Sequence, residues 1–155
     1  MRAGKDETKM THFTGIVMKS NTIPEGHPLV FSRKTLKEIV EYRKFINKPL
    51  FATSTLLHHS NRARKHHIGY ITDAWLAKSG HLHIFGELTT DLPSSTGEPL
   101  GLSLDSIIYD LTDRHLMTAE MLGKQMRVDS LYVQGVTLVY QRVAAFQCST
   151  FHVFK

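Results

Sequence analysis

The feature that most constrains the fold of this chain is a pair of alternating segments joined by a short polar turn. In Ile68–Leu76 and His81–Leu88, apolar side chains recur at alternate positions, which is the period of a half-buried β-strand. The residues between them, 77–80 (AKSG), are polar and end in glycine, as hairpin loops commonly do. The two segments therefore predict an antiparallel hairpin within a meandering sheet.

Other segments also have the composition of strands. Phe13–Met18 is a short apolar run that stops at a turn rich in Asn, Pro and Gly, residues 21–26. Residues 91–99 (DLPSSTGEP) are dense in structure breakers and predict a surface loop. The remaining extended segments are Leu50–Leu57, Leu100–Tyr109, Ser130–Tyr140 and Phe146–Phe154.

Two segments instead have the spacing of amphipathic helices. Ser32 is a suitable N-cap for Arg33–Ile46, where apolar residues share one face and lysine and glutamate occupy the other. Asp113–Met126 has a similar apolar stripe, which Gly123 weakens. Six or seven mostly sequential strands with two helices predict an α+β fold, in which a mainly antiparallel sheet forms a barrel or sandwich with the helices flanking it.

Chain length and cysteine content limit the possible domain organisation and the cellular compartment. A chain of 155 residues can bury a core without disulfides, and the single Cys148 cannot form an internal one, which favours a reducing compartment. Residues 1–12 are charged and have no apolar period, so we expect a mobile arm followed by a single domain over residues 13–155. Without an apolar run of membrane length or a signal peptide, a soluble intracellular protein is expected.

The basic, histidine-rich composition needs an explanation. The formal net charge is +5, and ten residues are histidines. Four of these flank a basic stretch, residues 58–67 (HHSNRARKHH). A zinc site could use His58 or His59 with His66 or His67, but no spacing typical of zinc proteins accompanies them. We therefore expect no metal.

The same stretch could bind nucleic acid. Arg62, Arg64 and Lys65 would then contact phosphates, although no aromatic residues are interleaved with them and the net charge is modest. The simplest interpretation is a solvated basic loop with one structural histidine. Weak attraction to acidic surfaces would fit the same charge.

A serine within an apolar strand is the main candidate for chemistry. In residues 100–105 (LGLSLD), alternation puts Ser103 on one face of the strand and Leu102 and Leu104 on the other. Asp105 and the absence of an immediately following helical pattern argue against the G-x-S-x-G elbow of α/β-hydrolases. A strand-borne serine can still be a nucleophile if a histidine from a neighbouring strand takes its proton and a third group orients that histidine. Taken alone, such a serine is more often an ordinary half-buried residue.

Several segments, taken in order, resemble one protein family. They are residues 20–21 (SN) followed by the helix at 36–46, 47–51 (NKPLF) leading to 57–59 (LHH), 68–75 (IGYITDAW), 86–88 (GEL), 100–103 (LGLS) and 133–139 (VQGVTLV). Their order and spacing over residues 13–151 resemble the prohead, or capsid maturation, proteases of tailed bacteriophages. That family is similar in fold to the herpesvirus assemblins, so the resemblance implies an assemblin-like barrel.

The resemblance implies roles for individual residues. Residues 57–60 (LHHS) match the family element that carries the general base, which implies that His59 is the base. The match of residues 100–103 implies that Ser103 is the nucleophile. The chain departs from the family where His58 replaces a carboxylate and where a short loop replaces a helical stretch before the serine strand.

The third catalytic member is not fixed by the match. The family uses a histidine in the viral assemblins and often an acidic residue in phages. Glu87, on the strand after His59, is the first choice, and His81, His83 and Asp129 are alternatives.

The resemblance further implies a serine endopeptidase that cleaves scaffolding protein, major capsid protein and itself inside the prohead, in the host cytoplasm. Such an enzyme needs no cofactor, and backbone N–H groups would stabilise the oxyanion, assisted by Arg127 or Arg142. His59 must be neutral to act as a base, so activity is expected to fall as the pH drops through about 6.5. The basic surface would dock acidic scaffold or capsid segments, and a homo-oligomer is expected.

Two other functions remain open from the sequence. A non-catalytic β-barrel component of the capsid would keep the fold without bringing His59 within hydrogen-bond reach of Ser103. A basic nucleic-acid-binding barrel would gather residues 62–67 in one exposed patch away from Ser103. Cys148 is not a candidate nucleophile, because no histidine-bearing motif is matched to it.

Overall fold

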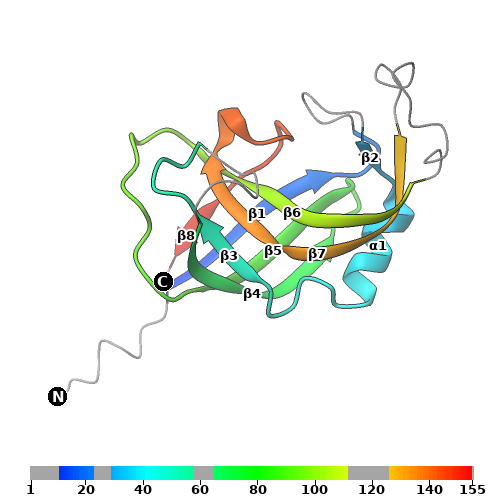
Figure 1. Ribbon diagram of the computed structural model, residues 1–155, viewed down its shortest axis with the longest axis horizontal. Helices are drawn as coiled ribbons and strands as arrows, with labels where there is room; N and C mark the ends of the chain where they lie inside the picture. The colour runs from blue at the N-terminus through cyan, green and yellow to red at the C-terminus, as the bar shows by residue number, and fades with distance from the viewer. Residues whose placement is uncertain (1–10, 23–28, 58–64, 112–125, 155) are drawn as a thin grey trace.

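Strands account for most of the regular structure. The computed structural model describes residues 11–22, 29–57, 65–111 and 126–154, with side chains for all of these except 29, 106–111 and 126–131. In chain order the elements are β1 (Thr11–Lys19), β2 (Leu29–Phe31), α1 (Arg33–Glu41), β3 (Pro49–Ala52), β4 (His66–Leu76), β5 (His81–Leu88), β6 (Leu100–Leu111), β7 (Met126–Tyr140), the 3-10 helix η4 (Gln141–Val143) and β8 (His152–Phe154). Within these described ranges the strands join into one sheet of eight strands, which curls into a half-barrel (Figure 1).

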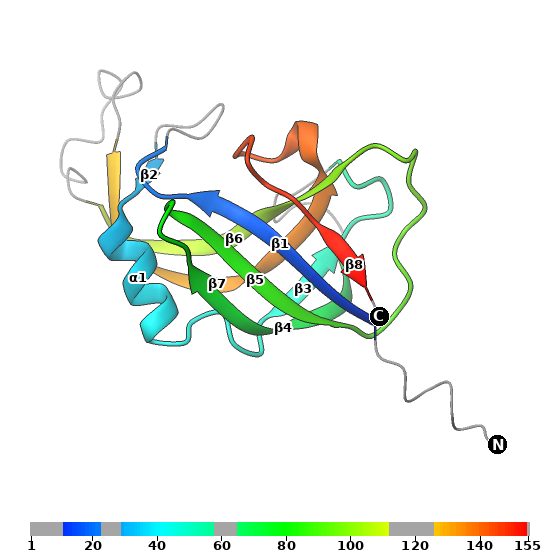
Figure 2. The ribbon, with the colours of Figure 1, turned by 180° about the vertical axis from the view of Figure 1, so that it is seen from behind.

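The sheet combines antiparallel and parallel pairs. β6 pairs antiparallel with one edge of the long strand β7, and β2 and β3 pair in parallel with successive parts of its other edge. From β3 the order continues through β4, β5, β1 and β8, and each of these pairs is antiparallel (Figure 2). The expected sheet is therefore confirmed as mainly antiparallel, but it is mixed. The reason is that α1 connects β2 to β3, and a helical connection lets both strands run in the same direction along β7.

The hairpin predicted between residues 68 and 88 is confirmed. β4 and β5 pair antiparallel, and the turn closes through hydrogen bonds from Ala77 N to His81 O and from Gly80 N to Ala77 O, both 2.9 Å. Gly80 has a φ of +91°, which residues with a side chain rarely adopt. The glycine that ends the predicted loop is therefore the residue that its backbone shape requires.

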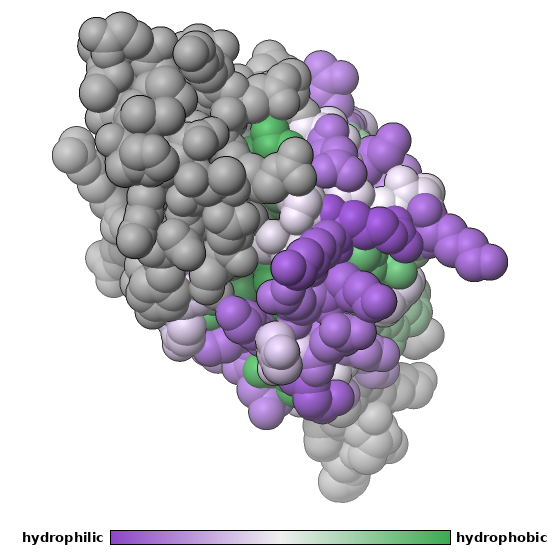
Figure 3. All heavy atoms as spheres, turned by 90° about the vertical axis from the view of Figure 1, so that its right-hand side faces the viewer, coloured by the Kyte–Doolittle hydropathy of each residue, from purple (hydrophilic) through white to green (hydrophobic). Residues whose placement is uncertain are grey.

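Helix α1 begins where its sequence predicts. The Ser32 Oγ accepts the Thr35 N–H at 3.1 Å, so Ser32 is the N-cap. Leu36 and Ile39 are fully buried against the sheet, which gives the helix its apolar face. The end of the molecule that α1 covers presents mostly hydrophilic side chains to solvent (Figure 3).

The helix ends at Glu41, earlier than the predicted Arg33–Ile46, because Arg43 adopts a φ of +56° and the Lys44 N–H donates to the Ile39 carbonyl at 3.0 Å, which closes the last turn. The Asn47 N–H donates to the carbonyl of Ile71 in β4, and the Ile71 N–H donates to the carbonyl of Lys48. Asn47, with a φ of +64°, makes a second change of direction before β3. The left-handed turn at Arg43 therefore ends the helix, and pairing with β4 then holds the residues that lead into β3.

One serine joins β1 to β6 across the open side of the curl. Ser149 is buried, and its Oγ accepts the Leu102 N–H of β6 at 2.7 Å. Its own hydrogen can serve the carbonyl oxygen of either Leu102 or Ile16 of β1, each 2.9 Å away. The segment between η4 and β8 thereby holds the curl together.

The core lies inside the curl and beneath α1. Its largest fully buried side chains are Phe13, Phe45, Met18, Leu36, Ile39, Leu50, Leu56, Ile71, Leu82, Ile84 and Leu102. Because side chains alternate along a strand, the residues between the core positions of β5 and β6 lie on the other face of the sheet.

Several predicted bounds differ from the structure. β1 begins at Thr11, so residues 11 and 12 belong to the sheet rather than to the expected arm, and residues 1–10 lie outside the described part. The expected helix Asp113–Met126 also lies outside it, except that Met126 is the first residue of β7.

Two predicted strands are shorter in the structure. The strand expected at residues 50–57 is limited to Pro49–Ala52, and the one expected at 146–154 is limited to His152–Phe154. In both cases apolar residues of the remaining stretch, such as Leu56 and Phe146, are buried in turns or loops. Burial, rather than strand pairing, accounts for their apolar character.

Candidate functional site

The predicted nucleophile lies on β6, on the face away from the core. Ser103 is directly opposite Thr137 of β7, and its neighbour Leu102 points into the core. Ser103 is only 6% exposed. Within the described part of the chain its hydroxyl has no hydrogen-bond partner. Among the described residues, the fully buried side-chain oxygen without a partner is Thr53 Oγ1, so the Ser103 hydroxyl is unpaired without being fully closed off from solvent.

A buried carboxylate lies beside Ser103 on the same strand. Asp105 is two residues further along β6, so its side chain shares the Ser103 face. Its Oδ2 accepts the Thr137 hydroxyl at 2.5 Å, and its Oδ1 accepts a hydrogen bond from Lys65 Nζ at 2.9 Å. The side chains of Asp105 and Lys65 are 5% and 12% exposed. Asp105, Lys65 and Thr137, here called the Asp105 cluster, therefore form a buried ion pair with one hydroxyl donor.

The Asp105 cluster is compatible with the sheet because β7 lacks a side chain at one position. Gly135 is opposite Asp105, and a Cβ there would lie 2.7 Å from the Pro49 carbonyl oxygen and 3.0 Å from the Phe51 ring. The Lys65 ammonium is 5.8 Å from the centre of the same ring. Gly135 therefore lets β3 and Lys65 close over β7 next to the carboxylate.

The predicted base, His59, falls in residues 58–64, outside the described part of the chain. The structure does describe the residues on either side of this segment. On one side the Leu56 carbonyl accepts the Tyr140 N–H, at the end of β7, at 2.8 Å. On the other side Lys65 belongs to the Asp105 cluster. Both flanks are thus tied to the pair of strands that carries Ser103.

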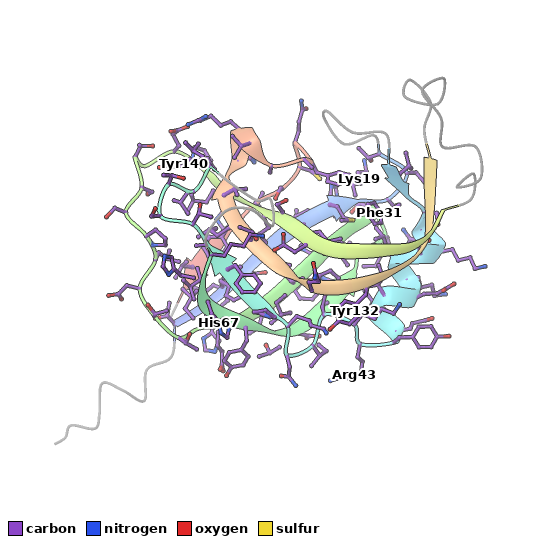
Figure 4. All side chains as sticks on the ribbon, in the orientation of Figure 1. Lys19, Phe31, Arg43, His67, Tyr132 and Tyr140 are labelled. Atoms are coloured by element: carbon purple, nitrogen blue, oxygen red, sulfur yellow. The ribbon has the colours of Figure 1, made fainter. Side chains whose placement is uncertain are left out.

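Of the basic stretch, the structure describes only residues 65–67. Lys65 is buried in its ion pair, whereas His66 and His67 are exposed at the start of β4. His67 lies at the end of the sheet away from α1, with its ring 6.2 Å from that of Phe51 (Figure 4). Lys65 therefore does not contribute to an exposed phosphate-binding surface. Among the described residues, no group of three or more potential metal ligands is gathered.

Glu87, the first choice for the third member, is bonded elsewhere. The Tyr70 hydroxyl of β4 donates to its carboxylate, and His12 Nε2 of β1 lies 3.7 Å from its Oε1. This hydrogen bond is the largest cause of a raised Tyr70 pKa, followed by burial and by the charge of Glu87. In the pairing order β4, β3 and β7 lie between β5 and β6. The structure therefore engages Glu87 with β1 and β4 and does not place it with Ser103.

The alternatives for the third catalytic residue lie elsewhere on the sheet or have side chains outside the described residues. His81 Nδ1 lies 2.7 Å from Ser79 Oγ at the tip of the β4–β5 hairpin. The His83 ring stacks on Trp75, with centroids 5.2 Å apart and planes 5° from parallel. Burial, and then nearby His81, lowers the pKa of His83. Asp129 is in β7, but its side chain lies outside the described residues.

One of two arginines, Arg127 or Arg142, is expected from the sequence to help stabilise the oxyanion. The Arg127 side chain lies outside the described residues. Arg142 Nε donates to Glu98 Oε1 at 2.7 Å, and this bond is the main cause of a lowered Glu98 pKa. An open pocket of about 250 Å³ beside this pair is lined by Glu98, Pro99, Gln141, Arg142, Ala144 and Gln147. Neither Ser103 nor the Asp105 cluster lines it.

Cys148 is a poor nucleophile in this structure. Its side chain is half-buried, and this burial raises the pKa of the thiol. A raised pKa leaves less of the reactive thiolate at neutral pH. The sequence expectation that Cys148 has no nucleophilic role is compatible with this environment.

The Asp105 cluster is not among the site residues expected from the sequence. Asp105 was used only to exclude a hydrolase elbow, although strand alternation already puts it on the Ser103 face. Lys65 was grouped with exposed basic residues, and Thr137 was only one β-branched residue in a strand. A sequence signal existed for Asp105 alone, since the other two contacts depend on how β4, β6 and β7 are arranged.

Comparisons with known proteins do not assign this chain to a family. No known protein family matches this chain, and no characterised protein is detectably related to it. In the described residues, no helix combines the length and the apolar character needed to cross a bilayer. The geometry around Ser103 is therefore the basis for a functional proposal.

Proposed function

We propose that this protein is a serine endopeptidase of the prohead protease type, with an assemblin-like barrel and Ser103 as its nucleophile. The observation that carries the proposal is that Ser103 is buried, has no hydrogen-bond partner in the described part of the chain, and lies beside the Asp105 cluster. Ser149 provides the contrast, because its hydroxyl is engaged with both Leu102 and Ile16. A structural serine uses its oxygen in this way, whereas a nucleophile must keep it for the substrate.

His59 is the proposed general base. It is two residues beyond Leu57, and two residues of extended chain span at most about 7 Å. Before His59 in the chain, the nearest described residue with a sheet contact is Leu56, whose carbonyl accepts the Tyr140 N–H at the end of β7, and the role of His59 itself rests on the resemblance of residues 57–60. The proposal leaves Glu87 out, because its carboxylate is engaged by Tyr70 and His12.

The proposed reaction is acyl transfer in two halves. The Ser103 oxygen forms a bond to the scissile carbonyl carbon while His59 accepts the hydroxyl proton. The C–N bond then breaks, and His59 returns the proton to the departing amine. Water hydrolyses the resulting ester with His59 again acting as base, which regenerates the serine. No cofactor is required for these steps.

The resemblance to prohead proteases suggests the substrates and the compartment. Scaffolding protein, major capsid protein and the chain itself are the proposed substrates, cleaved inside the prohead in the host cytoplasm by a homo-oligomeric enzyme. The net charge of +5 would favour docking to acidic segments of these partners.

The test is covalent labelling followed by cleavage. The purified protein is treated with a fluorophosphonate probe, which forms a bond to an activated serine and releases fluoride, and is also incubated with candidate scaffold and capsid proteins. Wild type is expected to react at Ser103 and to cleave, whereas Ser103→Ala and His59→Ala should fold but do neither. Ser94→Ala, a serine in the exposed loop, is the matched control and should behave as wild type. Full activity of Ser103→Ala would contradict the assignment, and an unreactive folded wild type would favour a non-catalytic capsid component.

A further inference from the structure

We propose that Asp105 is a positioning residue for the reaction of Ser103 and that it acts through Thr137 and Lys65. This inference rests on the proposed function. Asp105 bonds to a side chain on each of two neighbouring parts of the sheet, and both partners lie on the face that carries Ser103. Asp105 itself does not touch the substrate in this proposal.

The first role concerns the hydrogen of the Thr137 hydroxyl. Directly opposed residues in an antiparallel pair have Cβ atoms about 4.5–5.5 Å apart, so Thr137 is the nearest cross-strand neighbour of Ser103. The Thr137 hydroxyl donates to Asp105 Oδ2 at 2.5 Å. A hydroxyl has a single hydrogen, so Thr137 cannot also donate to the Ser103 oxygen. Asp105 thereby keeps the lone pairs of Ser103 available for attack on a carbonyl.

The second role concerns the Lys65 ammonium. Asp105 Oδ1 holds Nζ at 2.9 Å, and the side chains of both residues are largely buried. A positive charge fixed in a poorly solvated position interacts strongly with charge that develops nearby. Lys65 thus provides a positive charge on the Ser103 face, whereas Arg142 is paired with Glu98 in a different part of the structure.

Both roles require the same carboxylate. Asp105 follows Ser103 by two residues, a separation of about 7 Å along a strand, so it is close enough to organise the site without occupying it. Replacing it with Asn would keep the shape but remove the charge that holds Lys65. The amide would also be able to donate to Thr137, which would reverse the direction of that hydrogen bond.

The test compares Asp105→Asn, Thr137→Val and Thr137→Ser with wild type. For each folded variant we would measure the rate of fluorophosphonate labelling, and kcat and KM for a peptide that wild type cleaves. We expect Asp105→Asn to lose about a hundredfold in labelling rate and kcat with little change in KM, as a small displacement of reacting groups does. Thr137→Val removes the hydrogen bond that orients the Asp105 carboxylate toward Lys65 and should lose about tenfold, the equivalent of one hydrogen bond to a charged group, whereas Thr137→Ser keeps this bond and should retain the rate. Glu87→Gln serves as the control and should react as wild type.

The possible failures are distinguishable. If wild type does not react with the probe, the proposed function is wrong and the positioning role is wrong with it. If wild type reacts and folded Asp105→Asn reacts equally fast, only the positioning role is wrong. Should Asp105→Asn not fold, the two Thr137 variants decide the question, because equal rates for Thr137→Val and Thr137→Ser would overturn the proposal.

Discussion

Two carboxylates of this protein have similar partners and different surroundings. Asp105 on β6 contacts a threonine hydroxyl and a lysine, and Glu87 on β5 contacts a tyrosine hydroxyl and a histidine. The Asp105 side chain is 5% exposed and that of its partner Lys65 is 12% exposed, whereas Glu87 and His12 are 20% and 29% exposed.

The partners alone therefore do not determine how much a carboxylate contributes to stability. A buried charge that loses its partner cannot be solvated by water, so the remaining charge is strongly destabilising. Around Glu87, water can replace a lost partner, and the interaction is screened. We therefore expect the Asp105 cluster to be sensitive to substitution and the Glu87 group to be tolerant.

The largest expected effect follows from Asp105→Ala. This substitution leaves the Lys65 ammonium buried without its carboxylate, and we expect the free energy of unfolding to fall by about 3 kcal/mol. Urea denaturation monitored by circular dichroism measures the change. The double variant Lys65→Met with Asp105→Leu removes both charges and should recover most of the loss. A loss as small as that of Glu87→Gln would show that the two carboxylates are equivalent.

The next effect is that of Glu87→Gln, which should change the urea midpoint only slightly. The main consequence should be on Tyr70, whose pKa is raised chiefly by the hydrogen bond to Glu87. Removing the carboxylate should bring the Tyr70 pKa back toward the ordinary tyrosine range, and NMR titration of the Tyr70 ring would measure this shift. Tyr42→Phe, which changes a highly exposed tyrosine elsewhere, is the control and should leave the Tyr70 pKa unchanged. An unchanged Tyr70 pKa would contradict the role given to Glu87.

The smallest effect is a pH dependence of stability at His83, which lies on the same face of β5 as Glu87. Burial lowers the pKa of His83 in the folded state, so the unfolded chain binds this proton more tightly. The His83 contribution to stability should therefore decline as the pH falls from about 6.5, the ordinary histidine value, toward the lower folded pKa. Trp75 is the single tryptophan and stacks on His83, so its fluorescence should report the titration. His83→Gln should abolish the fluorescence change, and a persisting change would assign it to another group.

Local sequence patterns predicted much of the fold. The hairpin of β4 and β5 follows from alternation and from Gly80, whose positive φ its turn requires. Helix α1 begins at its predicted cap, Ser32. The predicted end of the helix was wrong, because the chain turns at Arg43, and Asn47 and Lys48 then pair with β4, a distant part of the chain.

The candidate site was predictable only in part, for the same reason. Alternation put Ser103 on the face of β6 opposite Leu102, and it lies there in the structure, where Asp105 shares its face. The roles given to Glu87 and to Lys65 depended on which strands lie next to each other. Local spacing contains no information on that order, and the curled sheet gave each of them a partner that the sequence did not indicate.

The sequence by itself determined the strand segments, the hairpin, the start of the helix and the face on which Ser103 lies, because these depend on residues close together in the chain. The packing of the sheet then brings the lysine just before β4, a threonine of β7 and an aspartate of β6 into one buried cluster beside that serine. The physical reason is that burial is a property of the assembled sheet. A lysine at the edge of a basic stretch becomes a buried ion-pair partner only when Gly135 lets β3 close over β7 and excludes water.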